Sequence, residues 1–256
     1  MLIDTHAHLF FPNFDNDLDQ VIENAKASGV KAILVPGTDL ETSKKAIELS
    51  DKYEMVYAAV GVHPHDTKDW ESKWVNDLRK LAEHKKVVAI GEIGLDYFYD
   101  YSPKEKQIEA FKQQIALALK LNFPIIVHNR DSNEDLMEII REYKDTNLKA
   151  QFHCFAGSAE DAKELVEMGH FISFTGNITF KSRQELRDIL LNIKPENLLL
   201  ETDSPFMTPV PFRGKRNEPA HVNYVAEKIA EIHDLTKEEV GKITSQNVFE
   251  LFGIGE

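Results

Sequence analysis

Two histidines lie two positions apart near the start of the chain. His6 and His8 follow the short apolar run at residues 2–3. On a β-strand, side chains at i and i+2 point to the same face, so both imidazoles would lie on one side. Neutral imidazole is a common metal ligand near neutral pH. The spacing therefore predicts half of a divalent-cation site, whose other ligands must come from elsewhere.

The elements that must position these ligands follow from the hydrophobic pattern. Short β-rich runs alternate with amphipathic stretches along the chain. We expect eight strands, at residues 2–8, 32–36, 56–63, 87–92, 124–128, 150–153, 171–175 and 198–203. We expect helices between them at residues 18–28, 41–53, 70–84, 105–121, 134–144, 159–168 and 182–191. Strands alternating with helices in this number predict an α/β fold, a (β/α)8 TIM barrel.

Two further helices are expected after the eighth strand. Residues 220–233 and 237–252 have helical patterns, and Thr236 and Glu239 have the spacing of a capping box. With 256 residues and 42% hydrophobic content, the chain is long enough for one large core. We therefore expect residues 1–256 to form a single barrel domain, which helices within about 220–252 close.

Composition restricts the class of protein. The single Cys154 excludes an intramolecular disulfide framework, and the chain has neither a signal-peptide pattern nor an apolar run of transmembrane length. A cytoplasmic protein without membrane contact, a monomer or weak homo-oligomer, is expected. The net charge of −13 argues against non-specific binding along a polyphosphate, which needs many basic side chains. Any contact with nucleic acid should therefore be local and assisted by metal.

Polar residues follow six of the expected strands, where a TIM barrel places its active site. A lone histidine after an apolar run is more often a hydrogen-bonded core residue, but six strand ends with the same character favour a site. These residues are His6, His8, His63, His65, Glu92, Asp96, His128, Arg130, His153, Glu201 and Asp203. Histidines and carboxylates together offer the nitrogen and oxygen ligands that zinc, manganese, nickel or magnesium accept.

At these motifs the sequence resembles a known family, the TatD-type metal-dependent hydrolases of the amidohydrolase superfamily. The resemblance spans nearly the whole chain. It rests on DTHAH at 4–8, GVHP at 61–64, AIGEIGLD at 89–96, IVHNR at 126–130, HCFAG at 153–157, LETDSP at 200–205 and FRGKRNEP at 212–219. Each motif is weak alone, whereas their order and their positions on the expected strands are highly specific.

The resemblance implies a site for two divalent cations, Mg, Mn, Zn or Ni. One would be held by His6, His8, Glu92 and Asp203, and the other by Glu92, His128 and His153. Glu92 would bridge them, where a carboxylated lysine often does so elsewhere in the superfamily. A water between two cations becomes hydroxide near neutral pH. We expect Asp203 to take its proton, so Asp203 and Glu92 are the expected catalytic residues.

Four residues are candidates for substrate binding. His63 could donate to a scissile phosphate, whereas His65 is interpreted as fixing the turn. Arg130 could bind an anion through two parallel hydrogen bonds, or form a salt bridge with Asp131 or Asp96. Arg213 and Arg216 belong to a basic loop in a barrel region that often binds phosphate, or to a solvated loop.

Two carboxylates precede expected ligands by two positions. Asp4 and Glu201 would point the same way one layer deeper, where they could orient an imidazole or the loop arginines. Filling the polar centre of the barrel is the alternative. Cys154 is interpreted as a packed residue rather than a nucleophile. Phe10 or Phe11 could lie at the rim and stack on a base.

The sequence leaves three classes of function open. The resemblance and the basic loop favour a phosphodiesterase that trims nucleic acid from an end, a DNase or RNase. The same activated water would serve a two-metal hydrolase of a carbonyl ester, such as an aminoacyl-RNA deacylase, or of a lactone or small amide. A metal-binding module without catalysis is the third class, disfavoured because no expected ligand is missing. A substrate screen separates these classes.

Overall fold

The computed structural model describes residues 1–254, and the chain divides into two compact units. One unit consists of Met1–Val35 and Ser158–Glu256, and the other of Pro36–Gly157. The eight strands of the sheet follow one another in sequence order, from β1 to β8. This is the strand order of a (β/α)8 barrel, so the expected fold class is confirmed.

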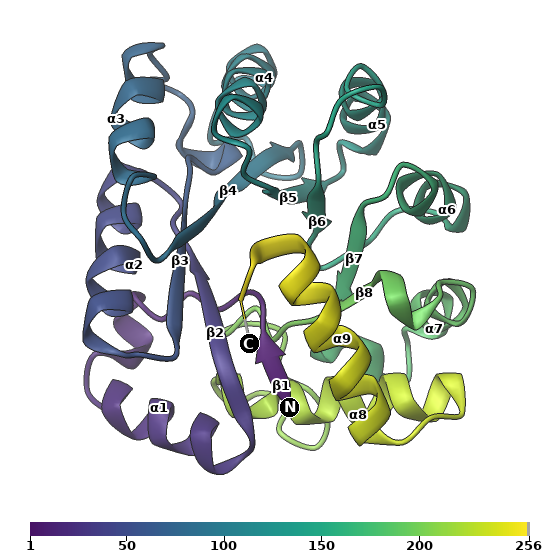
Figure 1. The fold of residues 1–256 in the computed structure, drawn as a ribbon. Helices are drawn as coiled ribbons and strands as arrows, with labels where there is room; N and C mark the ends of the chain where they lie inside the picture. Colours follow the sequence, from purple (N-terminus) through teal and green to yellow (C-terminus); the bar gives the residue numbers. More distant parts are fainter. Residues whose placement is uncertain (255–256) are drawn as a thin grey trace. The chain divides into compact units, whose positions relative to one another are not determined.

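The unit Pro36–Gly157 contains four strands that alternate with helices, as Figure 1 shows. Its strands are β3 (Val56–Val60), β4 (Val87–Asp96), β5 (Ile125–Arg130) and β6 (Ala150–Phe152), and the pairs β3–β4, β4–β5 and β5–β6 are parallel. Its helices are α2 (Leu40–Lys52), α3 (Lys73–Leu81), α4 (Lys104–Leu121) and α5 (Asn133–Arg141), with a short 3-10 turn η2 (Pro64–Asp66).

Local signals explain where these elements begin and end. Nine of the ten residues of β4 are buried, as expected for a parallel strand that is covered on both faces. Helix α2 begins with a capping box in which Asp39 and Thr42 bond to each other's backbone N–H groups. Helix α4 ends at Leu121. The next residue, Asn122, has a left-handed backbone (φ 56°), and its N–H bonds to the carbonyls of Ala118 and Leu119.

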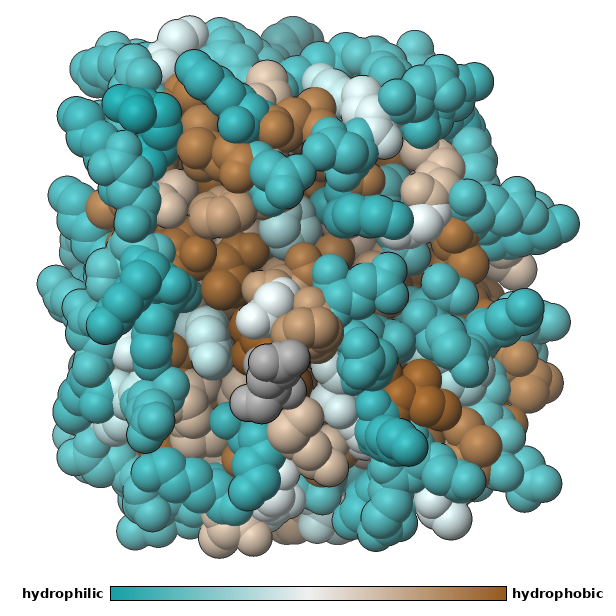
Figure 2. All heavy atoms as spheres, viewed as in Figure 1, coloured by the Kyte–Doolittle hydropathy of each residue, from teal (hydrophilic) through white to brown (hydrophobic). Residues whose placement is uncertain are grey.

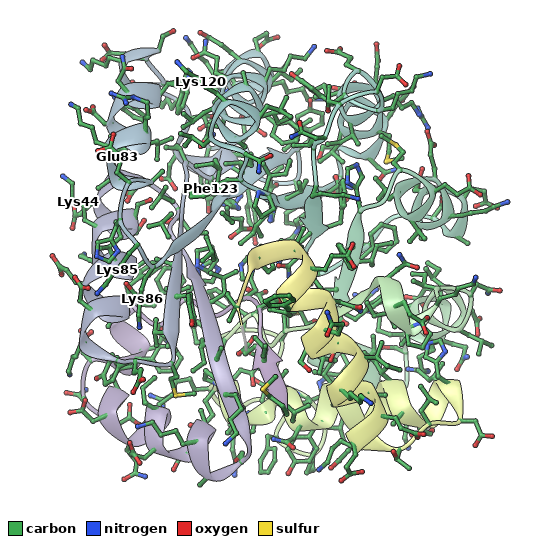
Figure 3. The ribbon with its side chains drawn as sticks, in the orientation of Figure 1. Lys44, Glu83, Lys85, Lys86, Lys120 and Phe123 are labelled. Carbon is green, nitrogen blue, oxygen red and sulfur yellow. The ribbon has the colours of Figure 1, made fainter. Side chains whose placement is uncertain are left out.

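A lysine ties the end of α2 to the strands. Lys86, labelled in Figure 3, lies just before β4, and its Nζ donates to the carbonyl oxygens of Tyr53, Glu54 and Val56 at 3.2, 2.6 and 3.1 Å. Burial lowers the pKa of Lys86, although the nearby Glu54 opposes this effect. The ammonium group therefore satisfies backbone acceptors where the chain leaves α2 and enters β3.

The unit Met1–Val35 with Ser158–Glu256 contains the remaining elements. Its strands are β1 (Leu2–Asp4), β2 (Val30–Pro36), β7 (Phe171–Phe174) and β8 (Leu198–Leu200), and the pairs β1–β2 and β7–β8 are parallel. Its α-helices are α1 (Leu18–Ala27), α6 (Ala159–Glu167), α7 (Gln184–Leu191), α8 (Val222–His233) and α9 (Lys237–Phe252). Its 3-10 turns are η1 (Pro12–Phe14), η3 (Gly176–Thr179), η4 (Pro195–Asn197) and η5 (Pro219–His221).

The two helices expected after the last strand are confirmed as α8 and α9. They lie side by side next to β1 in Figure 1. The expected capping box is also present, because Thr236 accepts from the Glu239 N–H and Glu239 accepts from the Thr236 N–H. A Cβ at Gly241 would lie only 2.6 Å from the Met1 carbonyl oxygen, so glycine permits the close approach of α9 to the start of β1.

Several strands end earlier in the structure than the sequence predicts. Strand β1 ends at Asp4, yet the backbone beyond it remains hydrogen-bonded, from Thr5 N to Leu200 O and from Ala7 N to Leu34 O. His6 and His8 thus follow the strand in a segment whose backbone bonds first to Leu200 and then to Leu34.

The surface is largely polar on the face that Figure 2 shows, where hydrophobic residues appear in small areas between hydrophilic ones. Among the described residues, no helix is both long enough and apolar enough to cross a membrane.

Candidate metal centre

Three side chains of the unit Pro36–Gly157 bring their donor atoms together in a triangle. Glu92 Oε1 lies 2.9 Å from both His128 Nδ1 and His153 Nε2, and the two ring nitrogens are 3.3 Å apart. Ligands about 2.1 Å from one cation, at angles of about 90–110°, are separated by about 3.0–3.4 Å. The triangle therefore fits the donor set of a zinc ion or a similar divalent cation.

Three consecutive strands hold this triangle. Glu92 lies on β4, His128 on β5, and His153 follows β6, with its N–H bonded to the Val127 carbonyl at 3.1 Å. Gly94 pairs with His128 in the β4–β5 register. Gly94 has a φ of 143°, and a Cβ there would collide with the His128 carbonyl oxygen. Glycine thus allows the two ligand-bearing strands to approach each other.

A buried carboxylate supports His128 from the other side of its ring. Asp96 Oδ2 lies 3.0 Å from His128 Nε2 and 2.8 Å from His65 Nε2, and it accepts a hydrogen bond from each ring. Asp96 Oδ1 accepts from the backbone N–H groups of Phe98 and Tyr99. With Nε2 bonded to a carboxylate, His128 directs Nδ1 toward Glu92, which is the arrangement that orients metal-binding imidazoles.

The electrostatics of this pair follow from the same contacts. Burial alone would raise the pKa of Asp96, but the hydrogen bonds from His128 and His65 outweigh it and hold the pKa well below its usual range. Burial alone would lower the pKa of His128, whereas the hydrogen bonds with Asp96 and Glu92 raise it. Asp96 is therefore ionised at neutral pH behind His128.

His63, expected to bind substrate, lies beside the proposed metal ligands. His63 Nε2 lies 3.5 Å from Glu92 Oε1, and donor atoms of His63, Glu92 and His128 all lie within 4.8 Å of one another. His63 Nδ1 accepts from the His65 backbone N–H, so its Nε2 points toward Glu92. His63 thus has the position of an additional ligand or of a donor to a group bound there.

A second cluster lies in the other unit. His6 Nε2 is 3.2 Å from His8 Nε2, which is 3.6 Å from Asp203 Oδ1, and donor atoms of all three lie within 4.8 Å of one another. All three side chains are buried. Two imidazoles and a carboxylate form a donor set that zinc and manganese accept.

The backbone places Asp203 beside the two histidines. Its N–H bonds to the His6 carbonyl at 2.9 Å, and Ala7 forms a parallel bridge with Ser204. Asp203 has a φ of 55°, in the left-handed region that non-glycine residues rarely occupy. Such strain persists only where the surroundings impose it, and it often occurs at functional sites.

The two carboxylates expected to lie behind the ligands are both fully buried. Asp4 accepts from the Thr202 N–H at 2.9 Å, from the Thr202 hydroxyl at 2.6 Å and weakly from the His6 N–H. Burial raises the pKa of Asp4 to about 8, against the effect of the Thr202 bonds. Glu201 accepts from the Ser173 hydroxyl at 2.8 Å. Asp4 thus joins the two backbone segments that carry His6 and Asp203.

The candidate arginines have different surroundings. Arg216 forms two 2.7 Å bonds with the Asp17 carboxylate, which is typical of a structural ion pair. Arg213 lies over the Phe180 ring, 4.1 Å from its centre. Arg130 stacks on Phe98 and, within residues 1–254, forms none of the expected salt bridges with aspartate.

Comparison with known proteins identifies the family. The family model described as TatD related DNase matches residues 3–253. The chain belongs to this family. It is 48% identical over 254 residues to "Uncharacterized metal-dependent hydrolase YabD" of Bacillus subtilis, covering 99% of this chain and 100% of that protein. It is 36% identical over 259 residues to "3'-5' ssDNA/RNA exonuclease TatD" of Escherichia coli, covering 99% of both.

A solved structure agrees with this assignment. The TatD homologue YJJV of Escherichia coli superposes with a TM-score of 0.93 at 31% identity, covering 99% of this chain and 98% of that one. The resemblance seen in the motifs is confirmed, and the protein is a metal-dependent hydrolase of the TatD family.

Sequence reasoning missed part of the centre of this TatD family member. From the sequence, Asp96 is one of the polar residues at the strand ends and an alternative partner of Arg130, and His65 is interpreted as fixing the turn. Neither is connected with His128 at that level. The structure joins both to His128. The position of Asp96 at the end of the expected fourth strand was the available signal, but the identity of its partners depends on the strand register.

Proposed function

We propose that the protein is a divalent-metal-dependent phosphodiesterase that removes nucleotides from an end of a nucleic acid. His6, His8 and Asp203 would hold one cation, and Glu92, His128 and His153 the other, with Glu92 as the bridge between them. The observation that carries the proposal is the donor triangle around Glu92 Oε1. In a (β/α)8 barrel, residues from several strand ends build one active site.

Two observations favour a phosphodiester over a carbonyl ester. Several relatives with more than 30% identity, including the Escherichia coli TatD protein, are named 3'-5' ssDNA/RNA exonucleases. Arg130, close in sequence to the ligand His128, has no carboxylate partner among the described residues. A guanidinium group suits the paired oxygens of a phosphate.

Individual side chains would have distinct roles in the proposed hydrolysis. Divalent cations, when bound, lower the pKa of coordinated water and polarise the oxygens of a phosphodiester. Asp203 keeps a carboxylate oxygen near His8 and would accept the proton of the attacking water. Arg130 would donate hydrogen bonds to a phosphate. Asp96 would hold the His128 ring in place while its Nδ1 faces the cation.

The test is digestion of end-labelled single-stranded DNA by protein stripped of metal and reloaded with magnesium or manganese. We expect stepwise shortening by the wild type and a loss of at least about a hundredfold in Asp203→Asn, because general-base catalysis contributes about 10²–10⁴-fold. Asp145→Asn is the matched control, since Asp145 is exposed on a loop after α5.

Two results would overturn the proposal. One is an absence of shortening at full metal occupancy, combined with hydrolysis of aminoacyl-RNA or a lactone, which would assign the site to carbonyl chemistry. The other is undiminished digestion by the Asp203→Asn protein.

A further inference from the structure

An exposed aromatic segment follows β4 in the unit Pro36–Gly157. Phe98, Tyr99 and Tyr101 expose 54%, 37% and 58% of their surface. We call these three side chains the aromatic platform. Large apolar side chains cost free energy when they face water, so a cluster of them marks a surface that binds something.

The rings of the aromatic platform are arranged for stacking. Tyr99 and Tyr101 are parallel within 12°, with centres 5.2 Å apart, and Phe98 meets Tyr99 edge-on at 4.8 Å. The Arg130 guanidinium lies 4.0 Å from the Phe98 ring centre and 4.9 Å from that of Tyr99. Arg130 is exposed, so its N–H groups stay accessible to a ligand while the guanidinium lies over the ring.

The aromatic platform lies next to the ligand triangle of the same unit. The His65 ring meets Tyr99 edge-on at 5.2 Å and Tyr101 at 4.9 Å. His65 also bonds to Asp96, the carboxylate that holds His128. A molecule stacked on these tyrosines would therefore lie a few side chains from the proposed metal ligands.

The backbone under the aromatic platform is fixed. The buried Gln107 accepts from the Asp96 N–H and donates to the carbonyls of Asp96 and Ser102, so it joins both ends of the segment. Asp96 Oδ1 accepts from the N–H groups of Phe98 and Tyr99. A segment ordered in advance loses little conformational entropy when it binds.

We propose that the aromatic platform stacks with unpaired bases of a single-stranded nucleic acid, while Arg130 contacts the adjoining phosphate. The inference rests on the proposed function and names side chains that would contact the bases and the phosphate of its substrate. Each base offers a π-face for stacking, and a bound single strand exposes those faces, whereas a duplex occupies them with its own stacking. Aromatic rings beside a guanidinium match bases and phosphates together, which an aliphatic partner surface would not require.

The test separates binding from hydrolysis. Metal-loaded protein with Asp203→Asn, used to slow cleavage, is titrated into a fluorescent single-stranded oligonucleotide, and anisotropy gives the affinity. We expect Phe98→Ala and Tyr101→Ala each to weaken binding by about 5- to 150-fold, the range that corresponds to loss of one stacking contact. Tyr101→Phe should bind nearly as the parent does, because it keeps the ring.

Two controls make the result specific. Phe249→Ala removes an exposed ring from α9 and should leave the affinity unchanged. An oligonucleotide of equal length and charge but without bases should bind the parent and the platform variants equally. Equal affinities of parent and platform variants for the base-containing strand would overturn the inference, as would an equal loss with the strand that lacks bases.

Different results would contradict the proposed function and the proposed role of the aromatic platform. If the wild type hydrolyses no phosphodiester but Tyr101→Ala weakens base-dependent binding, the hydrolytic proposal is wrong and the platform stands. If the wild type shortens DNA and the platform variants bind both strands as the parent does, the platform is wrong and the hydrolytic proposal stands.

Discussion

Asp96 connects the histidines of the candidate metal centre with the backbone of the exposed aromatic segment. One of its oxygens accepts from the rings of His65 and His128, and the other from the backbone of the aromatic segment. The carboxylate is fully buried, so these bonds replace its hydration. A single side chain thus sets both the orientation of a proposed metal ligand and the shape of the proposed binding surface.

We predict that Asp96→Asn weakens metal binding by about 10- to 100-fold, the usual effect of removing a partner behind a metal-binding histidine. Asparagine can keep an acceptor oxygen for the backbone N–H groups, but an amide NH₂ then replaces the single oxygen that accepts from both rings, and the negative charge is lost. Isothermal titration of stripped protein with zinc or manganese measures the change. A variant that folds normally and binds metal as tightly as the wild type would show that Asp96 does not position His128.

At the scale of single residues, the sequence indicates which side chains could bind metal. It says little about which residues they contact. Glu92, His128 and His153 could be selected because each has a metal-binding side chain at an expected strand end. The role of Asp96 could not be predicted in the same way, because it depends on the β4–β5 register that puts Asp96 opposite Arg130 and near His128. Likewise, Arg216 and Arg130 have the same charge, but only the fold shows that Asp17 neutralises one of them.

At the scale of elements, periodicity predicted the alternation of strands and helices, but not where the strands end. The third expected strand, 56–63, becomes β3 ending at Val60, and the fourth, 87–92, becomes β4 extending to Asp96. A strand continues only while a neighbour provides hydrogen-bond partners, and those partners lie far away in sequence. Capping is local by contrast, so the box at Thr236 and Glu239 could be predicted.

The segment that leads into α8 provides a prediction about pH. His221 stacks on Phe212 with ring centres 4.7 Å apart and planes 9° apart, and its Nδ1 lies 2.9 Å from Asn217 Oδ1. Burial lowers the pKa of His221 below its usual 6.5. As pH falls through 6.5, the unfolded chain takes up a proton that the folded chain resists, so this histidine contributes less to the free energy of unfolding.

We therefore expect His221→Gln to be less stable than the wild type by about 1 kcal/mol at about pH 7.5, through the lost ring contact, and the difference to narrow at about pH 5.5. Denaturant unfolding at both pH values measures it. His233, whose pKa is also lowered by burial, is present in both proteins, so its contribution cancels. A difference that stays constant or widens in acid would contradict the assignment.

At the scale of the whole molecule, the chain is acidic. The net charge of −13 disfavours general attraction to a polyphosphate, and Arg216 is neutralised by Asp17. Attraction of the proposed anionic substrate would therefore depend on bound cations and a few side chains. Buried carboxylates and histidines form two clusters of potential ligands, so cations bound there would stabilise the folded chain.

Metal removal tests this dependence. A ligand that binds only the folded state adds about 2.7 kcal/mol at a free concentration about one hundred times its dissociation constant. We expect chelation to lower the unfolding temperature and added manganese or zinc to restore it in a concentration-dependent way, with two metal ions per chain by elemental analysis at saturation. Glu92→Gln should bind fewer ions and show a smaller shift, whereas Glu48→Gln, a matched change at an exposed site on α2, should behave as the wild type does. Saturation at one ion per chain would rule out the two-cation arrangement, and an unchanged shift in Glu92→Gln would remove Glu92 from the ligands.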